Sequence, residues 1–71
     1  MNERIQTPED LGARVRSRRL ELRLTQEDLA GVARVSPRLL GELERGKPSA
    51  QLAGILRILE ALGLALVVRS R

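Results

Sequence analysis

The stretch TQEDLAGVARVSPRLLGELERG, from Thr25 to Gly46, decides the fold of this chain. It contains two helix starts. Thr25 is a favourable N-cap residue, and Asp28 lies three residues later, at the capping-box position. Ser36 is a second favourable N-cap, and Pro37 follows at the first helical position, where a missing N–H costs nothing. Gly46 fits a helix end. The stretch therefore predicts two short helices separated by a tight turn of about four residues.

Two short helices paired across such a turn are typical of the helix-turn-helix motif, whose second helix enters the major groove of DNA. The second helix has two chemically different sides when it is drawn at the helical period. The inner side holds Leu40, Leu43 and Glu44, and the outer side holds Arg38, Glu42 and Arg45. An ordinary solvent-exposed helix can also have a polar outer side. Because this one is short, basic and close to the Pro37 end, we interpret it as a DNA-reading surface.

The composition restricts the class of protein. The chain has 71 residues, of which 42% are hydrophobic and none is aromatic, so we expect one small domain, residues 1–71, packed by aliphatic side chains. Lys and Arg number 13 against 9 acidic residues, and all of these cations except Lys47 are Arg. The planar fork of Arg suits phosphate and guanine. The formal charge of +4 is weak evidence by itself, because many proteins with such a charge bind nothing anionic.

Residues that other functions require are missing from the sequence. The chain has no Cys and no His, which excludes a disulfide, a zinc site built from these ligands and a His general base. The acidic residues are scattered, so we predict no enzyme activity and no cofactor. The N-terminus lacks a signal-peptide pattern, and the longest apolar run is too short to cross a bilayer. We therefore expect a soluble cytoplasmic protein with no membrane partner and no small-molecule ligand.

Thr7 and Pro8 start a further helix by the same rules, and we expect that helix to run to about Leu22. Its apolar stripe consists of Leu11, Val15 and Leu22, with Gly12 allowing a close approach. Arg19 lies on this stripe, so we expect its guanidinium to be partly buried and to need a carboxylate. Glu44 is the candidate partner, because it lies on the inner side of the second motif helix. The alternative is that Arg19 extends to water.

The sequence after Gly46 predicts a fourth helix and a strand. Ser49 is a candidate N-cap for a helix from about Ala50 to Leu62, and Gly63 fits its end. The main apolar stripe of this helix consists of Leu52, Ile55, Leu56, Leu59 and Leu62, widened by Ile58 and Ala61. Residues 64–69, LALVVR, alternate between two faces and are rich in β-branched and aliphatic residues, which predicts a strand.

A single strand in a helical domain has no partner in its own chain unless residues 4–7 pair with it. Unpaired strand edges favour pairing with another chain, and small domains are often stabilised by oligomerisation. We therefore predict a two-fold dimer in which the two copies of this strand pair. The predicted interface consists of Ile58, Leu62, Leu64, Leu66, Val67 and Val68.

The segments LTQEDLA, VS, LLGELERGK and LRILEALGL resemble the XRE/Cro-type helix-turn-helix family of phage repressors. Within that family the chain is most similar to HipB-like antitoxins, the DNA-binding partners of HipA-type serine/threonine kinases. The TPEDLG start, the ERGKPSA turn and the strand directly after ALGL carry this closer resemblance, which covers residues 7–69. It implies an all-α, four-helix, lambda-repressor-like domain with a C-terminal strand that pairs across the dimer.

The resemblance also implies roles for individual residues. Gln26 matches a position that contacts phosphate, and Arg19 and Glu44 match a pair that joins the first helix to the recognition helix. The positions that face the bases or their phosphates are Ser36, Pro37, Arg38 and Glu42. Arg45 and Lys47, at the helix end and just beyond it, are placed for phosphates.

The chain also departs from the family pattern. Arg34 stands where the family usually has a Gly between the motif helices, and a left-handed backbone at a residue other than Gly costs on the order of 1 kcal/mol. Pro37 and Gly41 occupy positions that are often polar in the family, so the family gives no guide to the operator sequence.

The sequence thus predicts a homodimeric transcriptional repressor that binds a palindromic operator in double-stranded DNA, on the bacterial nucleoid. The HipB resemblance implies that it also regulates its own operon and binds a HipA-like kinase toxin. One alternative is a stand-alone repressor without a toxin. Another is a protein-interaction module that inhibits a partner without binding DNA. Arg38 and Arg45 argue against the second alternative, whereas Glu42 slightly favours it.

Overall fold

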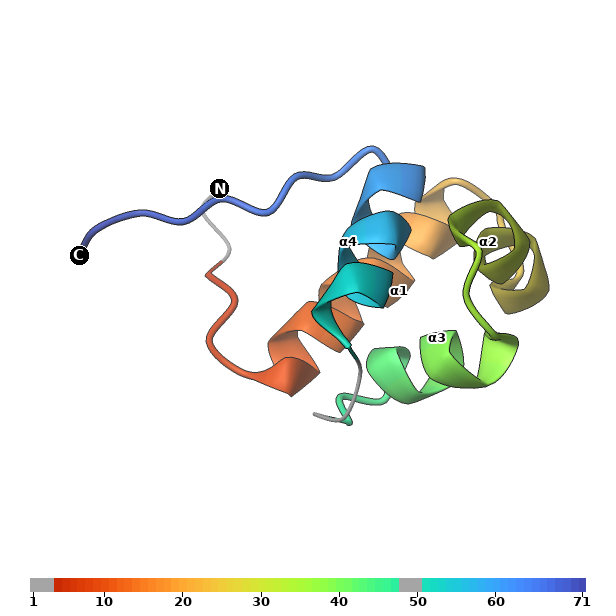
Figure 1. The fold of residues 1–71 in the computed structure, drawn as a ribbon, viewed down its shortest axis with the longest axis horizontal. Coiled ribbons are helices and arrows are strands. Elements are labelled where there is room, and N and C mark those ends of the chain that lie inside the picture. The colour runs from red at the N-terminus through yellow and green to blue at the C-terminus, as the bar shows by residue number, and fades with distance from the viewer. Residues whose placement is uncertain (1–3, 48–50) are drawn as a thin grey trace.

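A computed structural model describes residues 4–47 and 51–71 and shows four helices in this part of the chain. They are α1 (Pro8–Glu21), α2 (Gln26–Ala33), α3 (Pro37–Glu44) and α4 (Leu52–Ala61). α3 packs against α1 and α2, and α2 also packs against α4. In Figure 1, α2 and α3 lie together at one end of the molecule, and the C-terminal segment runs away from the helices on the other side. No helix among the described residues has the length and hydropathy needed to cross a membrane.

Side-chain caps fix the starts of the first three helices where the sequence predicted them. Thr7 accepts a hydrogen bond from the backbone N–H of Asp10 at 3.0 Å, and Pro8 is the first residue of α1. Thr25 and Asp28 form a complete capping box at the start of α2, with hydrogen bonds of 3.0 and 3.1 Å. These local bonds satisfy backbone donors that the first turn of a helix leaves without partners.

The starts of α3 and α4 differ from each other. Ser36 accepts from the backbone N–H of Leu39 at 3.0 Å, as expected for the N-cap of α3. α4 begins at Leu52, and its N-cap residue, Gln51, makes no side-chain capping bond. The predicted cap Ser49 and the predicted first residue Ala50 lie outside the described residues.

The core is a cluster of aliphatic side chains from all four helices. Its buried members are Val15, Leu29, Ala30, Ala33, Leu40, Leu43, Ile58, Leu59 and Leu62. Gly12 allows α1 to approach α3 closely, as predicted. A Cβ atom at Gly12 would lie 2.9 Å from the carbonyl oxygen of Glu44 and would collide with that of Leu43. The backbone of α1 therefore rests directly on the last turn of α3.

Two parts of the predicted apolar stripes were wrong. Leu22 is 40% exposed rather than buried, because α1 ends at Glu21 and the chain turns there. Ile58 and Leu62, one turn apart on α4, are only 0% and 1% exposed. They are core residues of the domain itself and have no surface left to contribute to a dimer interface, which corrects their predicted role. The stripe predicted to face the core on α4 is partly exposed instead, at Leu52 and Leu56.

Two arginines that the sequence reading did not single out bind the carbonyl ends of helices. Arg18 of α1 donates from Nε to the carbonyl of Leu62, at the end of α4, at 3.0 Å. Arg57 of α4 donates from Nε to the carbonyl of Ala33, the last residue of α2, at 3.1 Å. Cations are favourable at helix C-termini, where carbonyl groups lack partners within the helix. These contacts tie α1 to α4 and α4 to α2.

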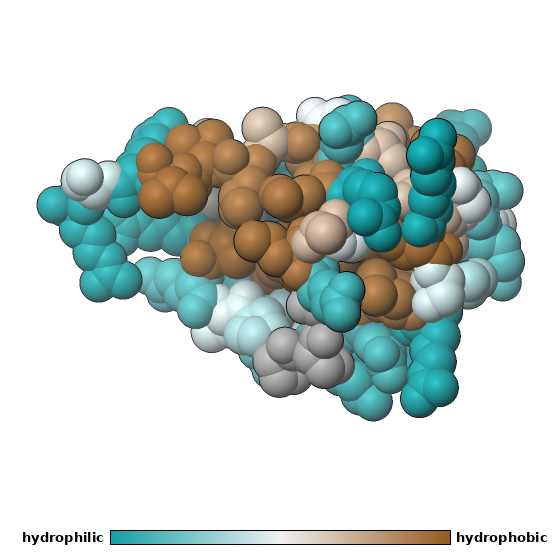
Figure 2. All heavy atoms as spheres, viewed as in Figure 1, coloured by the Kyte–Doolittle hydropathy of each residue, from teal (hydrophilic) through white to brown (hydrophobic). Residues whose placement is uncertain are grey.

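The predicted strand is not present as a strand in the described part of the chain. Residues 64–71 form no regular secondary structure, and among the described residues 65–71 make no backbone hydrogen bond. Leu64 packs against the core, but Leu66, Val67 and Val68 are 52%, 63% and 90% exposed. Figure 2 shows apolar atoms gathered along this segment and continuing toward α4. The segment therefore presents an apolar surface together with an unpaired backbone.

Candidate nucleic-acid interface

The start of α3 presents the residues that were predicted to face DNA bases. Ser36, Pro37 and Arg38 are all exposed, and the side chain of Arg38 is 86% exposed. Pro37 fixes the backbone at the first helical position, so the guanidinium of Arg38 extends from a well-defined first turn. This arrangement leaves an Arg fork free to meet an external partner.

The other side of α3 is held by the predicted ion pair. Arg19 and Glu44 make two parallel hydrogen bonds, Nε to Oε2 at 2.7 Å and Nη2 to Oε1 at 3.0 Å. Their side chains are only 9% and 4% exposed. Arg19 Nη1 also donates to the carbonyl of Leu24 at 2.8 Å, and Gln26 Nε2 donates to Glu44 Oε1 at 3.0 Å. The pair therefore joins α1, the turn before α2, α2 itself and α3.

The charges of this pair are stabilised by each other. The hydrogen bond to Glu44 raises the pKa of Arg19 above its usual value, although burial acts in the opposite direction. Burial by itself raises the pKa of Glu44. The hydrogen bonds from Arg19 and Gln26, with the nearby charges of Arg19 and Arg16, outweigh burial, and the pKa of Glu44 is lowered overall. Both groups remain charged at neutral pH, as a buried bidentate pair requires.

Glu42 lies between two cations on the outer side of α3. Its Oε2 is 3.6 Å from Arg38 Nε, one helical turn earlier, and 3.8 Å from Lys47 Nζ. Arg38 and Lys47 are exposed, so each contact contributes little to stability. The pairing offsets the negative charge of Glu42 and biases the orientation of the Arg38 side chain.

Gln26 and Arg45, two predicted phosphate contacts, lie on either side of Gly41. A Cβ atom at Gly41 would be 3.4 Å from Arg45 Nη1 and 3.8 Å from Gln26 Oε1. The small residue on α3 thus brings the amide of α2 and the guanidinium at the end of α3 close together. One N–H of the Gln26 amide is used by Glu44, which fixes the direction of the rest of that group.

The two turns that flank α2 contain residues in the left-handed region. Arg34, between α2 and α3, has φ 60° and ψ 44°, as expected for the position where the family usually has Gly. Arg23, between α1 and α2, has φ 58°, and the sequence reading did not anticipate this. A glycine is the ordinary signal for such a backbone, and neither turn contains one.

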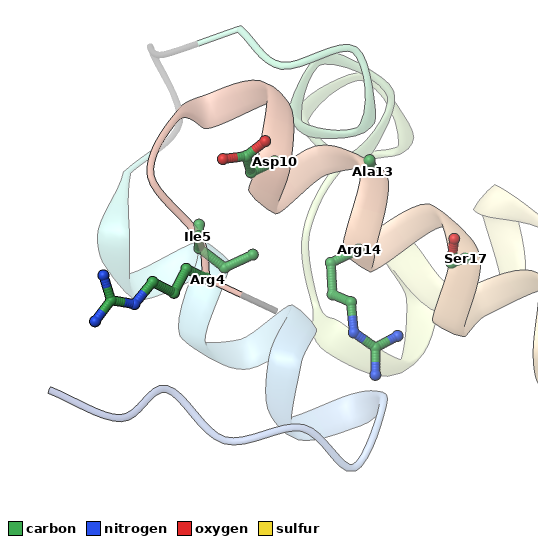
Figure 3. Close-up of a pocket in the computed structure, with 6 residues that line it drawn as sticks. All are labelled: Arg4, Ile5, Asp10, Ala13, Arg14 and Ser17. Carbon is green, nitrogen blue, oxygen red and sulfur yellow. The ribbon is translucent and has the colours of Figure 1, made fainter. Parts of the chain in front are cut away.

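A hollow of about 420 Å³ lies between the N-terminal segment and α1, away from these residues. It is lined by Arg4, Ile5, Asp10, Ala13, Arg14 and Ser17. Figure 3 shows the guanidinium groups of Arg4 and Arg14 directed to different places rather than to a common point. The carboxylate of Asp10 already accepts a hydrogen bond from the backbone of Gln6 at 3.0 Å. Within the described ranges, no group of three or more His, Cys, Asp or Glu side chains is arranged to hold a metal ion.

The tight turn between α2 and α3, together with the exposed outer side of α3, defines a helix-turn-helix domain. Residues 10–71 match the family described as helix-turn-helix domain. The chain is also 48% identical, over 66 residues, to the uncharacterized HTH-type transcriptional regulator y4mF of Sinorhizobium fredii (strain NBRC 101917 / NGR234). That match covers 93% of this chain and 87% of the relative. The chain therefore belongs to the helix-turn-helix transcriptional regulators, of the XRE type that its motifs predicted.

Solved structures of HipB have the same fold. A complex of a HipB variant with an O2 20mer matches this chain with a TM-score of 0.88 and 20% identity, covering 99% of this chain and 97% of that one. A HipB–O4 20mer complex and a HipA–HipB–O2–O3 complex each match with a TM-score of 0.87 and 20% identity, over 97% of both chains. These matches confirm the HipB-like arrangement of the four helices.

Proposed function

We propose that this chain is a dimeric transcriptional repressor that binds a palindromic operator and acts as the antitoxin of a HipA-like serine/threonine kinase. The outer side of α3 is the observation that carries the DNA-binding part. Its first turn exposes Ser36, Pro37 and Arg38, while the Arg19–Glu44 pair holds its last turn in place. A firmly held helix with an exposed Arg fork at its start suits readout of the major groove.

The residues of this surface divide into two roles. Arg38 reads guanine through its O6 and N7 atoms, with Ser36 and Pro37 beside it at the base edges. Glu42 accepts from a cytosine amine or holds Arg38 in orientation, which its 3.6 Å contact with Arg38 supports. Phosphate contacts set the position of the protein on DNA without reading the sequence, and they come from Gln26, Arg45 and Lys47.

Dimerisation through the C-terminal segment completes the proposal. Leu66, Val67 and Val68 are exposed, and the backbone of this segment has unused hydrogen-bonding groups among the described residues. Pairing with the same segment of a second copy would satisfy these groups and cover the apolar side chains. Leu64, packed against the core, connects the segment to the domain. A two-fold dimer would place its recognition helices about 34 Å apart, to read two half-sites one turn of DNA apart.

The likeness to HipB supports the antitoxin part of the proposal. One of the similar structures is a complex that contains HipA as well as HipB. We infer that this chain binds a kinase of the HipA type through surfaces that it does not use for DNA, and represses its own operon.

Two experiments separate this proposal from its alternatives. Binding titrations compare the DNA upstream of its own gene with a scrambled duplex of the same composition, and tighter binding of the upstream DNA is expected. Purification of the tagged protein from its native host is scored for a serine/threonine kinase. Upstream DNA binding without a kinase would indicate a stand-alone repressor. A stable protein partner without any DNA binding would indicate an interaction module and overturn the proposal.

A further inference from the structure

The turns on either side of α2 share a costly backbone conformation. Arg23 and Arg34 are the residues other than glycine that have positive φ in the described parts of the chain, at 58° and 60°. L-amino acids avoid this region because their Cβ atom crowds the neighbouring carbonyl group, and glycine adopts it without strain. Each turn would therefore be less strained with glycine, yet each contains arginine. Local strain of this kind persists where a side chain has a function.

Contacts within the described part of the molecule give no reason for these two side chains. Both residues are exposed, and neither guanidinium has a hydrogen bond or an ion pair there. Other arginines of the domain behave differently. Arg18, Arg19 and Arg57 each donate to a carbonyl or carboxylate group of another element. Arg23 and Arg34 thus offer unused charge at positions where the backbone would favour another residue.

Both arginines occupy equivalent places relative to the motif helices. Arg23 lies two residues before Thr25, the N-cap of α2, and Arg34 lies two residues before Ser36, the N-cap of α3. The carbonyl of Leu24, next to Arg23, accepts the 2.8 Å hydrogen bond from Arg19.

Arg19 in turn binds Glu44, which accepts a hydrogen bond from Gln26. The first turn is thereby fastened beside the residue that we assign to phosphate. The second turn leads directly into the recognition helix. Its geometry is fixed by the hydrogen bond from the backbone N–H of Val35 to the carbonyl of Ala30, at 3.0 Å.

We propose that Arg23 and Arg34 bind phosphates of duplex DNA on either side of α2 and so extend the DNA contacts beyond α3. This inference rests on the proposed DNA-binding function. The guanidinium fork pairs well with phosphate oxygens. Contacts of this kind add affinity and salt dependence on any sequence, and they add no preference for one base over another.

Glycine substitutions test the proposal, because a backbone role and a DNA role change different measurements. The variants are Arg23→Gly and Arg34→Gly, with Arg23→Lys and Arg34→Lys to keep the charge. Arg71→Gln removes one positive charge at the chain end, which Figure 1 places far from α2 and α3, and serves as the control. Binding of the full chain to a random duplex of about 30 base pairs is followed by fluorescence anisotropy between about 50 and 200 mM NaCl.

Each glycine variant should bind about three- to tenfold more weakly at about 0.1 M salt, with a slope of log affinity against log salt reduced by about one. Its melting temperature should be unchanged or higher, since glycine relieves the strain. The lysine variants and Arg71→Gln should bind nearly as tightly as the wild type. Glycine variants with the wild-type affinity and slope would overturn the inference while leaving the DNA-binding proposal intact. Failure of the wild type itself to bind DNA would overturn both.

Discussion

Glu44 is the residue at which three helices meet. Both of its carboxylate oxygens accept hydrogen bonds from Arg19, and one of them also accepts from Gln26, so α1 and α2 are attached to the end of α3 through a single side chain. The carboxylate is almost fully buried. A buried ion pair contributes little by itself compared with apolar packing, but removal of one partner leaves the other charge without compensation.

Replacement of Glu44 by Ala should therefore lower the free energy of unfolding by about 3–5 kcal/mol. Small domains have a total of about 5–15 kcal/mol, so the variant should be close to unfolded at room temperature. Thermal unfolding followed by far-ultraviolet circular dichroism measures this loss in a chain without aromatic residues. Glu42→Ala on the same helix is the control and should change stability only slightly, because the contacts of Glu42 are with exposed side chains. A Glu44→Ala melting temperature within a degree or two of the wild type would contradict the role of the pair.

Arg38 and Arg45 should affect DNA binding in different ways. Arg38→Ala is expected to lose discrimination of about 1–3 kcal/mol at one base pair of each half-site, because a bidentate contact with guanine is removed. Arg45→Ala should weaken cognate and scrambled DNA alike and reduce the salt slope by about one. Titrations of both variants on both duplexes over a range of salt compare the two effects. An unchanged ratio of cognate to scrambled affinity for Arg38→Ala would remove it as the base reader.

At the scale of the helices, short-range rules were sufficient for most of the fold. Thr7, Thr25 and Ser36 cap helices within three residues of their own positions, so the sequence alone predicted where α1, α2 and α3 begin. The Arg19–Glu44 pair was also predictable, because helical periodicity placed a charged residue on an otherwise apolar stripe and an acid on the facing side. That approach predicts contacts only where the two patterns are both unusual.

Long-range and two-chain features were not predictable in the same way. Arg18 and Arg57 bind carbonyls 44 and 24 residues away, and a carbonyl leaves no trace in the sequence. The apolar arc of α4 was too wide for periodicity to choose which half faces the core, so Ile58 and Leu62 were misassigned to an interface. The left-handed turn at Arg23 lacks the glycine that would have signalled it. A strand over 64–69 requires a partner that one chain does not contain.

The C-terminal segment provides a direct test of the dimer. Val67→Lys should give a monomer, because a charged side chain would be buried where two copies of the segment pair. Val32→Lys is a matched control, since Val32 is 69% exposed against 63% for Val67 but lies on α2. Sedimentation velocity of both variants measures the change, and the monomeric variant should also lose affinity for a palindromic operator. A dimer that persists in Val67→Lys would place the interface elsewhere.

For the whole molecule, acid should be the condition that most clearly exposes the dependence on Glu44. The pKa of this carboxyl is lower in the folded protein than its ordinary value of about 4.5, so the unfolded chain takes up the proton more readily. The stabilisation is therefore complete above about pH 4.5 and is lost as the pH falls further, toward the lowered pKa. Denaturant unfolding of the wild type between neutral and acid pH measures this slope, with Glu44→Gln as the variant without the ionisable group. Equal slopes for the two proteins would exclude Glu44 as the source.

The absence of a side chain at Gly12 bears on how such a regulator changes over evolution. α1 holds the recognition helix through the carbonyls of Leu43 and Glu44, on its inner side and at its last turn. Pro37 and Arg38, on the outside of the first turn, have no part in this support and are exposed. A duplicated gene could exchange them and acquire a new operator while the scaffold stays intact. A library randomised at these outer positions should therefore consist largely of folded proteins, from which regulators with orthogonal targets can be selected.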